Sequence, residues 1–228
     1  MPINEWPVDQ RPREKLLHRG AASLDDAELL AIFLGSGLPG RSAVAVARAA
    51  LRDSGGLRAL LELSPGELGR LAGFGVARRA ALQAALELGR RYLGEPLQRA
   101  DAMQSPGAVA RYLMAQMRHH RHEVFVGLFL DTKNRLIACD ELFHGTINAA
   151  AVYPREVLRR AMHHNAAAVV FAHNHPSGEP TPSEADRRIT AQLIEVLGLV
   201  DIRVLDHVVI GDGRWVSMRE HDWPGGQV

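Results

Sequence analysis

The sequence contains very little cysteine, since Cys139 is the only one among its 228 residues. One thiol excludes an internal disulfide framework, and it also excludes a zinc site built on paired thiolates. Any metal that this chain binds must therefore be held by histidine, aspartate or glutamate. We interpret Cys139 itself, which lies in an apolar segment, as a small hydrophobic residue of a strand.

Long hydrophobic runs are absent as well. No stretch of about 18 apolar residues is available for a membrane-spanning helix. The opening segment, MPINEWPVDQRPREKLL, has no apolar core of the kind found in a signal peptide. Hydrophobic residues still make up 46% of the chain, which is enough for one large core or two modest ones. We therefore expect a soluble, globular, cytoplasmic protein that does not associate with membranes.

A strong charge of either sign is also missing, because the formal net charge is only +1. The first 99 residues lean slightly basic and the remainder slightly acidic. This imbalance is too small to demonstrate a nucleic-acid partner, which usually shows as a dense basic face. All but one of the 11 histidines lie after residue 100, so we expect the two halves to differ in their chemistry.

The first half has helical periodicity. Leu and Ala recur at intervals of three and four residues from Arg13 to Leu93, as on the buried face of amphipathic helices. Two segments are alike, each with an apolar residue, Gly-x-Gly, a short spacer and an Ala-rich helix with an early arginine. They are LGSGLPGRSAVAVARAAL and LAGFGVARRAALQAALEL. We predict an all-α domain over residues 1–95, built from a degenerate repeat of small helical hairpins.

The second of these segments resembles the second half of a helix-hairpin-helix element. The resemblance implies that Gly73 and Gly75 form a tight turn whose backbone amides hold a DNA phosphate. Arg78 and Arg79 follow in the first turn of the next helix, and DNA binding of this kind would be mostly electrostatic and salt-sensitive. Phe74 would be the apolar plug between the helices. The alternatives are a hairpin that docks another protein and a hairpin that is purely structural.

The helical pattern lapses around Pro96, which predicts a linker over residues 94–104 and a second domain over residues 102–224. The pair Ser105-Pro106 predicts the start of a helix. Two β-rich segments joined by DTKN predict a hairpin, and then come a helix, the buried strand AAAVVFAH, another helix and another strand. This order indicates an α/β domain with a mixed sheet.

Two histidines end the buried strand, in the segment HNHPSGEPTPSEAD. Successive strand residues point to opposite faces, so His173 and His175 should emerge on the same side. We expect Ser183 at the N-cap of the next helix and Asp186 one turn further on, able to turn back toward the imidazoles. Two histidines and one aspartate are a three-ligand set for zinc that leaves a fourth position for water. The alternative is that Ser183 and Asp186 only cap the helix, with no metal present.

The spacing of this segment is similar to the motif of the JAMM metalloproteins, also called JAB or MPN proteins: an upstream Glu, here Glu123, then His-x-His, seven residues, Ser, two residues, Asp. The similarity is closer to the bacterial RadC family (UPF0758), which EVFVGLFLDTKNRLI, FHGTINAAAVYPREVLRRAM and LDHVVIG also resemble. It extends over nearly the whole chain. The resemblance implies an α/β fold class, with a C-terminal mixed-sheet MPN (JAB) domain after the N-terminal helix-hairpin-helix-like domain.

The resemblance also implies a role for each residue of the motif. Zinc would be held by His173, His175 and Asp186, while Glu123 would be the general base and Ser183 would donate to the developing oxyanion. Taken without the family, Glu123 has a second interpretation as a solvated charge at the start of a strand.

These observations predict a zinc-dependent hydrolase of the JAMM metallopeptidase type, cleaving an amide or isopeptide bond of a protein substrate, with a helical domain that contacts DNA. The alternatives are a DNA-processing zinc nuclease and a non-enzymatic DNA-binding protein. Zinc deaminase chemistry is disfavoured because its C-x-x-C is absent, and H-E-x-x-H does not occur. Asp206 and His207 in LDHVVIG either support the zinc site from behind or form a satisfied core pair.

Overall fold

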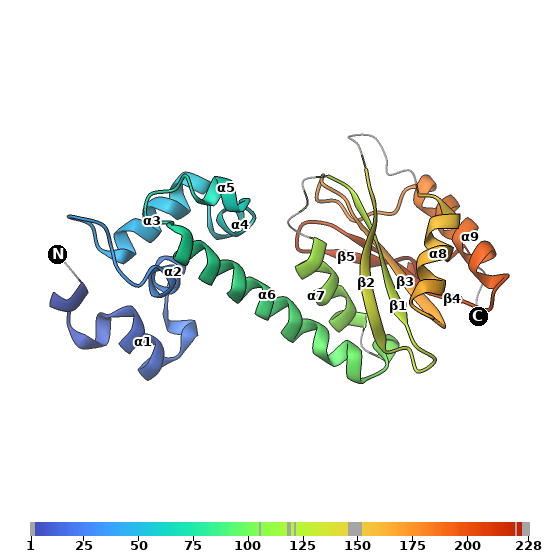
Figure 1. Ribbon diagram of the computed structural model, residues 1–228, viewed down its shortest axis with the longest axis horizontal. Coiled ribbons are helices and arrows are strands. Elements are labelled where there is room, and N and C mark those ends of the chain that lie inside the picture. The colour runs from blue at the N-terminus through green and yellow to red at the C-terminus, as the bar shows by residue number, and fades with distance from the viewer. Residues whose placement is uncertain are drawn as a thin grey trace. The chain divides into compact units, whose positions relative to one another are not determined.

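A computed structural model describes residues 3–104, 106–117, 120, 122–145, 152–221 and 223–224 of the chain. It divides into two compact units, Met1–Leu88 and Gly89–Val228 (Figure 1). Helices are the only regular elements among the described residues of the first unit, and the second is built around a five-stranded sheet. The predicted combination of an all-α part and a mixed-sheet α/β part is therefore confirmed.

The first unit consists of short helices, with α6 continuing beyond it. In chain order they are η1 (Ile3–Glu5), η2 (Val8–Gln10), α1 (Pro12–Arg19), η3 (Ala21–Ser23), α2 (Asp26–Leu34), α3 (Ala43–Ser54), α4 (Leu57–Leu61), α5 (Pro65–Leu68) and α6 (Val76–Arg99). The helical pattern did not single out α4, and α5, in the segment SPGELGRLAG that also has this pattern, is a single turn. Both are too short to show a helical period.

Capping residues set the limits of these helices. Asp25 and Glu28 form a capping box at the start of α2, and the Ser42 side chain accepts a hydrogen bond from the Ala45 amide at the start of α3. Gly55 ends α3 in the left-handed conformation that favours glycine. The helices bury a single apolar core, whose larger members include Leu30, Leu34, Val46, Leu60, Leu68, Phe74 and Leu82.

The predicted linker over residues 94–104 is wrong for most of its length, because α6 runs without interruption through Pro96 to Arg99. A proline inside a helix removes one backbone hydrogen bond. Packing outweighs that loss here, since Leu93 and Leu97 join the core of the second unit. The division between the units falls at Leu88/Gly89, earlier than the expected boundary at residue 95. None of the described helices is both long and apolar enough to cross a membrane.

The sheet has the strand order β2-β1-β3-β4-β5. Its strands are β1 (Val124–Leu130), β2 (Leu136–His144), β3 (Ala168–Asn174), β4 (Arg203–Ile210) and β5 (Trp215–Ser217). The predicted hairpin is confirmed as the antiparallel β1–β2 pair. β3 pairs antiparallel with β1 and parallel with β4, so the sheet is mixed as expected. β5 was missed because three residues are too few for an alternating pattern.

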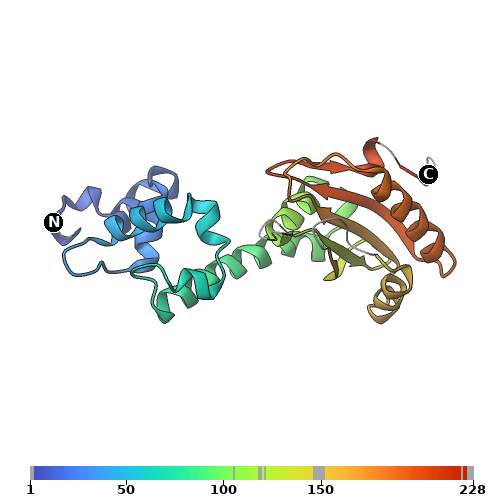
Figure 2. The same ribbon diagram turned by 90° about the horizontal axis from the view of Figure 1, so that it is seen from above.

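Helices cover both faces of the sheet, as Figures 1 and 2 show. On one face α7 (Pro106–Met117) packs against the strands, and on the other lie α8 (Pro154–His163) and α9 (Glu184–Gly198). A last turn, α10 (Met218–His221), follows β5. Ser105, the predicted cap of α7, lies outside the described residues. This three-layer arrangement buries every residue of β1 and β3, which places the end of β3 deep in the unit.

Cys139 lies on β2, where it packs partly buried against the core on the α7 face. Burial raises the pKa of its thiol to about 12. The thiol is therefore uncharged near neutral pH, in agreement with the prediction that Cys139 is a small hydrophobic strand residue.

Candidate metal centre

Three predicted residues converge where β3 ends and α9 begins. His173 is on β3, His175 follows its last residue, and Asp186 lies in the first turn of α9. The two Nε2 atoms are 2.9 Å apart, and Asp186 Oδ1 and Oδ2 lie 3.3 Å from Nε2 of His173 and 3.8 Å from Nε2 of His175, respectively. Among the described residues, this is the one group of His, Cys, Asp and Glu whose ligand atoms are close enough to hold a single metal ion.

The loop after β3 returns His175 to this position by backbone hydrogen bonds. The His175 amide donates to the Ile210 carbonyl at the end of β4 (2.8 Å), and the Asp212 amide donates to the Gly178 carbonyl (2.9 Å). Gly178 has φ +84°, a conformation that favours glycine. Gly211 passes so close that an added Cβ would collide with the Gly178 carbonyl oxygen. Backbone contacts with the β4–β5 turn thus hold the loop that carries His175 in place.

Asp186 belongs to a helix cap and to the histidine group at once. Its Oδ2 accepts hydrogen bonds from the Ser183 amide (2.7 Å) and the Ser183 hydroxyl (2.6 Å), and the Asp186 amide donates to Ser183 Oγ (3.2 Å). This is the capping box that was considered as the alternative to a metal site. The two interpretations are compatible, because Oδ1 of the same carboxylate is left facing His173.

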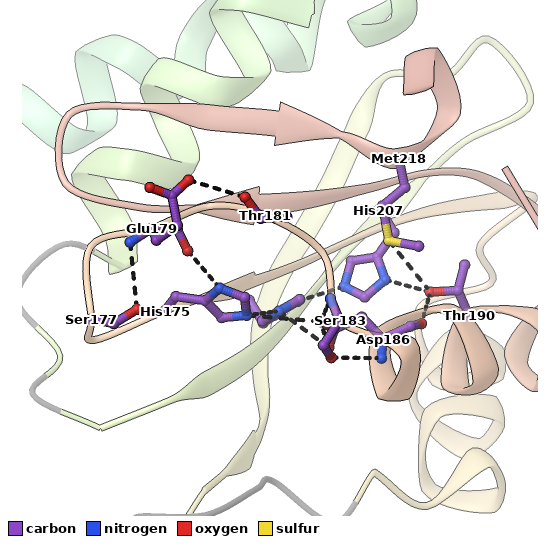
Figure 3. A network of polar contacts seen from close by, with 10 residues as sticks. His175, Ser177, Glu179, Thr181, Ser183, Asp186, Thr190, His207 and Met218 are labelled. Atoms are coloured by element: carbon purple, nitrogen blue, oxygen red, sulfur yellow. Dashed lines mark hydrogen bonds and ion pairs between the residues drawn. The ribbon is translucent and has the colours of Figure 1, made fainter. Parts of the chain in front are cut away.

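Nδ1 of His175, the ring nitrogen that faces away from His173 and Asp186, can only be a hydrogen-bond donor. It lies 2.7 Å from the carbonyl oxygen of Glu179 (Figure 3), and since a carbonyl only accepts, Nδ1 carries the proton. Nε2 of the neutral ring then presents a lone pair toward His173 and Asp186. Two imidazole nitrogens 2.9 Å apart need either a proton or a metal ion between them, and the adjacent carboxylate favours a positive charge there. The residues therefore fit a bound zinc ion.

The pKa values of His175 and Asp186 are both shifted by the interaction between them. The hydrogen bond with Asp186 raises the pKa of His175, although burial opposes this. Burial by itself would raise the pKa of Asp186, but the hydrogen bonds from His173, His175 and Ser183 hold it well below its usual range. Both shifts have one cause, which is that the site favours positive charge next to the carboxylate.

Glu123 lies immediately before β1 and is half-buried. It is not among the residues close enough to share a metal ion with the histidines, yet its carboxylate is near enough to help raise the pKa of His175. Glu123 thus lies within electrostatic range of His175 and outside the group of residues that can share a metal ion.

Asn174, between the two histidines, holds the segment that carries Glu123, and the sequence reasoning missed this role. Its side chain points away from the metal-binding group, where Oδ1 accepts from the buried Val124 amide (2.8 Å) and Nδ2 donates to the His122 carbonyl (3.1 Å). These are the backbone neighbours on either side of Glu123. Strand alternation had shown only that Asn174 faces the other way.

The Gly-x-Gly turn of the first unit has the expected buried plug and an unexpected asymmetry. Phe74 is 3% exposed within the core. Gly73 has φ +89°, and a Cβ there would lie 2.7 Å from Val46 Cγ1. Gly75 has neither a positive φ nor any atom near a Cβ, so the expectation that Gly75 is also needed for the turn is wrong.

The arginines after this turn bind the protein's own backbone. Arg78 donates to the Gly73 carbonyl (2.7 Å) and to the carbonyl and hydroxyl of Ser36 (2.9 and 2.7 Å). Arg79 donates to the Pro65 carbonyl (2.7 Å). Because Ser36 is the middle residue of the other Gly-x-Gly, Arg78 joins the two repeated turns. Both guanidinium groups thus stabilise the helical unit.

The mixed sheet covered by helices on both faces, with a two-histidine, one-aspartate group at one end, defines a RadC-like JAB domain. The sequence model of that domain family matches residues 103–223, and the model described as UPF0758 N-terminal matches residues 3–80. The chain therefore belongs to the RadC-like UPF0758 family, as its resemblance predicted.

Curated relatives agree with this assignment over the full length. A UPF0758 protein of Alcanivorax borkumensis is 63% identical, covering 96% of this chain and 97% of its own. A UPF0758 protein of Xanthomonas campestris pv. campestris is 58% identical over 98% of this chain and 99% of its own, and one of Stutzerimonas stutzeri is 55% identical over 98% and 100%. The family includes both units of the chain. The JAB domain places it in the superfamily of JAMM-type hydrolases.

Proposed function

We propose that this protein is a zinc-dependent hydrolase of the JAMM metallopeptidase type, which cleaves an amide or isopeptide bond of a protein substrate. The observation that carries the proposal is the convergence of His173, His175 and Asp186 on one point, with Glu123 beside it and outside the ligand set. A site with three protein ligands leaves room for water, whereas a purely structural zinc site has four.

Each residue of the site has a distinct role in the proposed hydrolysis. Zinc held by the two histidines and Asp186 would supply a water of lowered pKa and polarise the scissile carbonyl. Glu123 accepts a proton from the attacking water and delivers it to the leaving amine. Its electrostatic interaction with His175 and the hydrogen bonds by which Asn174 holds its backbone segment suit a group that must reach both water and substrate.

Ser183 is proposed as the donor to the developing oxyanion. In this structure its hydroxyl donates to Asp186 Oδ2, so that role requires the hydroxyl to turn from the carboxylate to the substrate. Ser183 is otherwise a positioning residue that orients Asp186.

The test compares Glu123→Gln with wild type after both are loaded with zinc. Peptide and isopeptide-linked libraries and labelled DNA are the substrates, and Glu195→Gln, an exposed position on α9, is the matched control. We expect turnover of a peptide or isopeptide bond in wild type and Glu195→Gln, and loss of turnover in Glu123→Gln with its zinc retained. Cleavage of DNA alone would support a nuclease instead, and no cleavage by a zinc-loaded protein would contradict the hydrolase.

A second proposed function is DNA contact through the first unit. The observation that favours it is the pairing of the two Gly-x-Gly turns through Arg78, which brings the two turns together. Backbone amides at the starts of α3 and α6 would hold phosphates. The arginine side chains support this arrangement by bracing the hairpins rather than by reaching for DNA.

A further inference from the structure

Behind the metal-binding group lies a chain of three hydrogen bonds. His173 Nδ1 is 2.8 Å from His207 Nε2, His207 Nδ1 is 2.6 Å from Thr190 Oγ1, and Thr190 Oγ1 is 2.6 Å from the carbonyl oxygen of Asp186 (Figure 3). His173, His207 and Thr190 are all 0% exposed. The chain starts at the backbone of one candidate ligand, passes through β4 and α9, and ends at the ring of another.

When the imidazole rings are neutral, the protons of this chain can be placed in only one way. Two oxygens 2.6 Å apart need a proton between them, and since the Asp186 carbonyl cannot donate, the Thr190 hydroxyl does. Thr190 Oγ1 must then accept from His207 Nδ1–H. A neutral His207 protonated on Nδ1 has its lone pair on Nε2, which accepts from His173 Nδ1–H. His173 is left with a lone pair on Nε2, the nitrogen that faces His175 and Asp186.

We propose that His207 and Thr190 are positioning residues that hold His173 in the one tautomer able to bind a metal through Nε2. The proposal rests on the metal centre of the proposed function and names the residues that prepare it. His207 and Thr190 are not metal ligands; His207 acts through the ring of His173, and Thr190 acts through His207 while also donating to the backbone of Asp186.

The arrangement differs from the usual support of a ligating histidine. A carbonyl or carboxylate is the common partner, and His175 has one in the Glu179 carbonyl. An imidazole can both donate and accept, so His207 alone does not define the tautomer of His173. The Thr190 hydroxyl removes that ambiguity because it accepts from Nδ1 of His207. Thr190, two hydrogen bonds away from the ring of His173, should therefore affect the metal affinity of His173.

Replacements at Thr190 separate positioning from packing. Thr190→Val keeps the shape and removes the hydroxyl, so His207 loses its acceptor and can shift its proton to Nε2, forcing a proton onto the metal-facing nitrogen of His173. We expect Zn²⁺ affinity, measured by competition with a chelator, to fall about tenfold or more. Thr190→Ser keeps the hydroxyl and loses a methyl group, and we expect its affinity to stay within about threefold of wild type although it packs less well.

Replacements at His207 give an independent comparison. His207→Gln offers an amide oxygen to His173 and an amide nitrogen to Thr190, and should retain most of the Zn²⁺ affinity. His207→Leu offers neither, and should lose about tenfold or more. If His207 and Thr190 only supported the packing, the Zn²⁺ affinity of the variants would follow their thermal stability without metal. It would not depend on whether the hydrogen-bonding groups are present, and this result would contradict the proposal.

The tautomer can also be read directly. In metal-free protein labelled with ¹⁵N-histidine at alkaline pH, His173 should carry its proton on Nδ1 in wild type and Thr190→Ser, and on Nε2 in a large fraction of Thr190→Val. Equal Zn²⁺ affinity in wild type and Thr190→Val, or an unchanged tautomer in Thr190→Val, overturns the proposal. This measurement needs neither substrate nor metal, so a wild type that binds no zinc would refute the proposed metal centre while the tautomer still tests the hydrogen-bond chain.

Discussion

Asp186 uses one carboxylate for two tasks, with Oδ2 in the cap of α9 and Oδ1 toward His173. The cap requires only an acceptor, whereas a metal ion requires a negative or strongly donating ligand. A single residue thus connects the local start of a helix to the proposed chemistry. The two tasks can be separated by substitution.

Asp186→Asn should keep the cap and lose the metal. The amide oxygen can still accept from the Ser183 backbone, but it lacks the charge that favours a cation. Zinc content by mass spectrometry should fall strongly, while metal-free Asp186→Asn should unfold close to wild type. Asp186→Ala should lose zinc and also roughly 0.3–1.5 kcal/mol of stability through the cap. Full zinc retention in Asp186→Asn would show that this carboxylate is not a ligand.

Asn174 should affect the general base without affecting the metal. Asn174→Ala leaves the buried Val124 amide without its acceptor, which should cost about 1–3 kcal/mol in chemical unfolding. Because the side chain points away from the histidines, zinc content should stay at the wild-type level, while any hydrolysis that depends on Glu123 should fall. If Asn174→Ala lost zinc as His173→Ala is expected to, its role would lie with the histidines instead.

At the scale of elements, the loop between β3 and α9 depends on its packing against the β4–β5 turn. The carbonyl of Gly178 accepts from Asp212, and Gly211 passes next to the same oxygen. A side chain at position 211 would therefore push on the segment that carries His175, although Gly211 is far from the motif in sequence.

Gly211→Ala should weaken zinc binding by displacing this loop. Relieving the collision should also destabilise the fold by about 1–3 kcal/mol, as overpacking usually does. Gly198→Ala is the matched control, since a Cβ there meets no atom within 4 Å. Chelator competition and thermal unfolding measure both effects, and a Gly211→Ala protein with wild-type zinc affinity would show that the loop does not need this close approach.

For the whole molecule, the proposed DNA contact and the proposed metal chemistry belong to different units. The full chain should bind duplex DNA weakly at low salt and with no sequence preference, because backbone amides recognise phosphates and not bases. Affinity should fall steeply with salt as counterions are released. His173→Ala should bind as wild type does in a fluorescence titration. No binding at low salt would favour protein docking by the hairpins.

Zinc should stabilise only the unit that holds the site. Free zinc at 100 times its dissociation constant adds about 2.7 kcal/mol to the folded state that binds it. In calorimetry, zinc should therefore raise the unfolding temperature of Gly89–Val228 and leave that of Met1–Leu88 unchanged. In His175→Ala, zinc should change neither unfolding temperature. An equal shift of both transitions would mean that the units unfold together.

Elements with strong local signals were predictable from the sequence, and those shaped by distant packing were not. The β1–β2 hairpin follows from two apolar, β-rich segments joined by a turn, and the capped start of α9 follows from the spacing of Ser183 and Asp186. The passage of α6 through Pro96 depends on Leu93 and Leu97 reaching the core of the second unit, which a local window does not contain. The inward use of Arg78 depends on Ser36, far away in the chain.

By itself, the sequence determined that His173 and His175 share one face and that Asp186 stands inside a helix capped by Ser183, because the strand period and the cap are local rules. Only the tertiary structure decided what stands behind His173. The parallel pairing of β3 with β4 and the packing of α9 bring His207 and Thr190 to it. Hydrogen bonds between such distant positions depend on how the elements pack, so no spacing in the sequence encodes them.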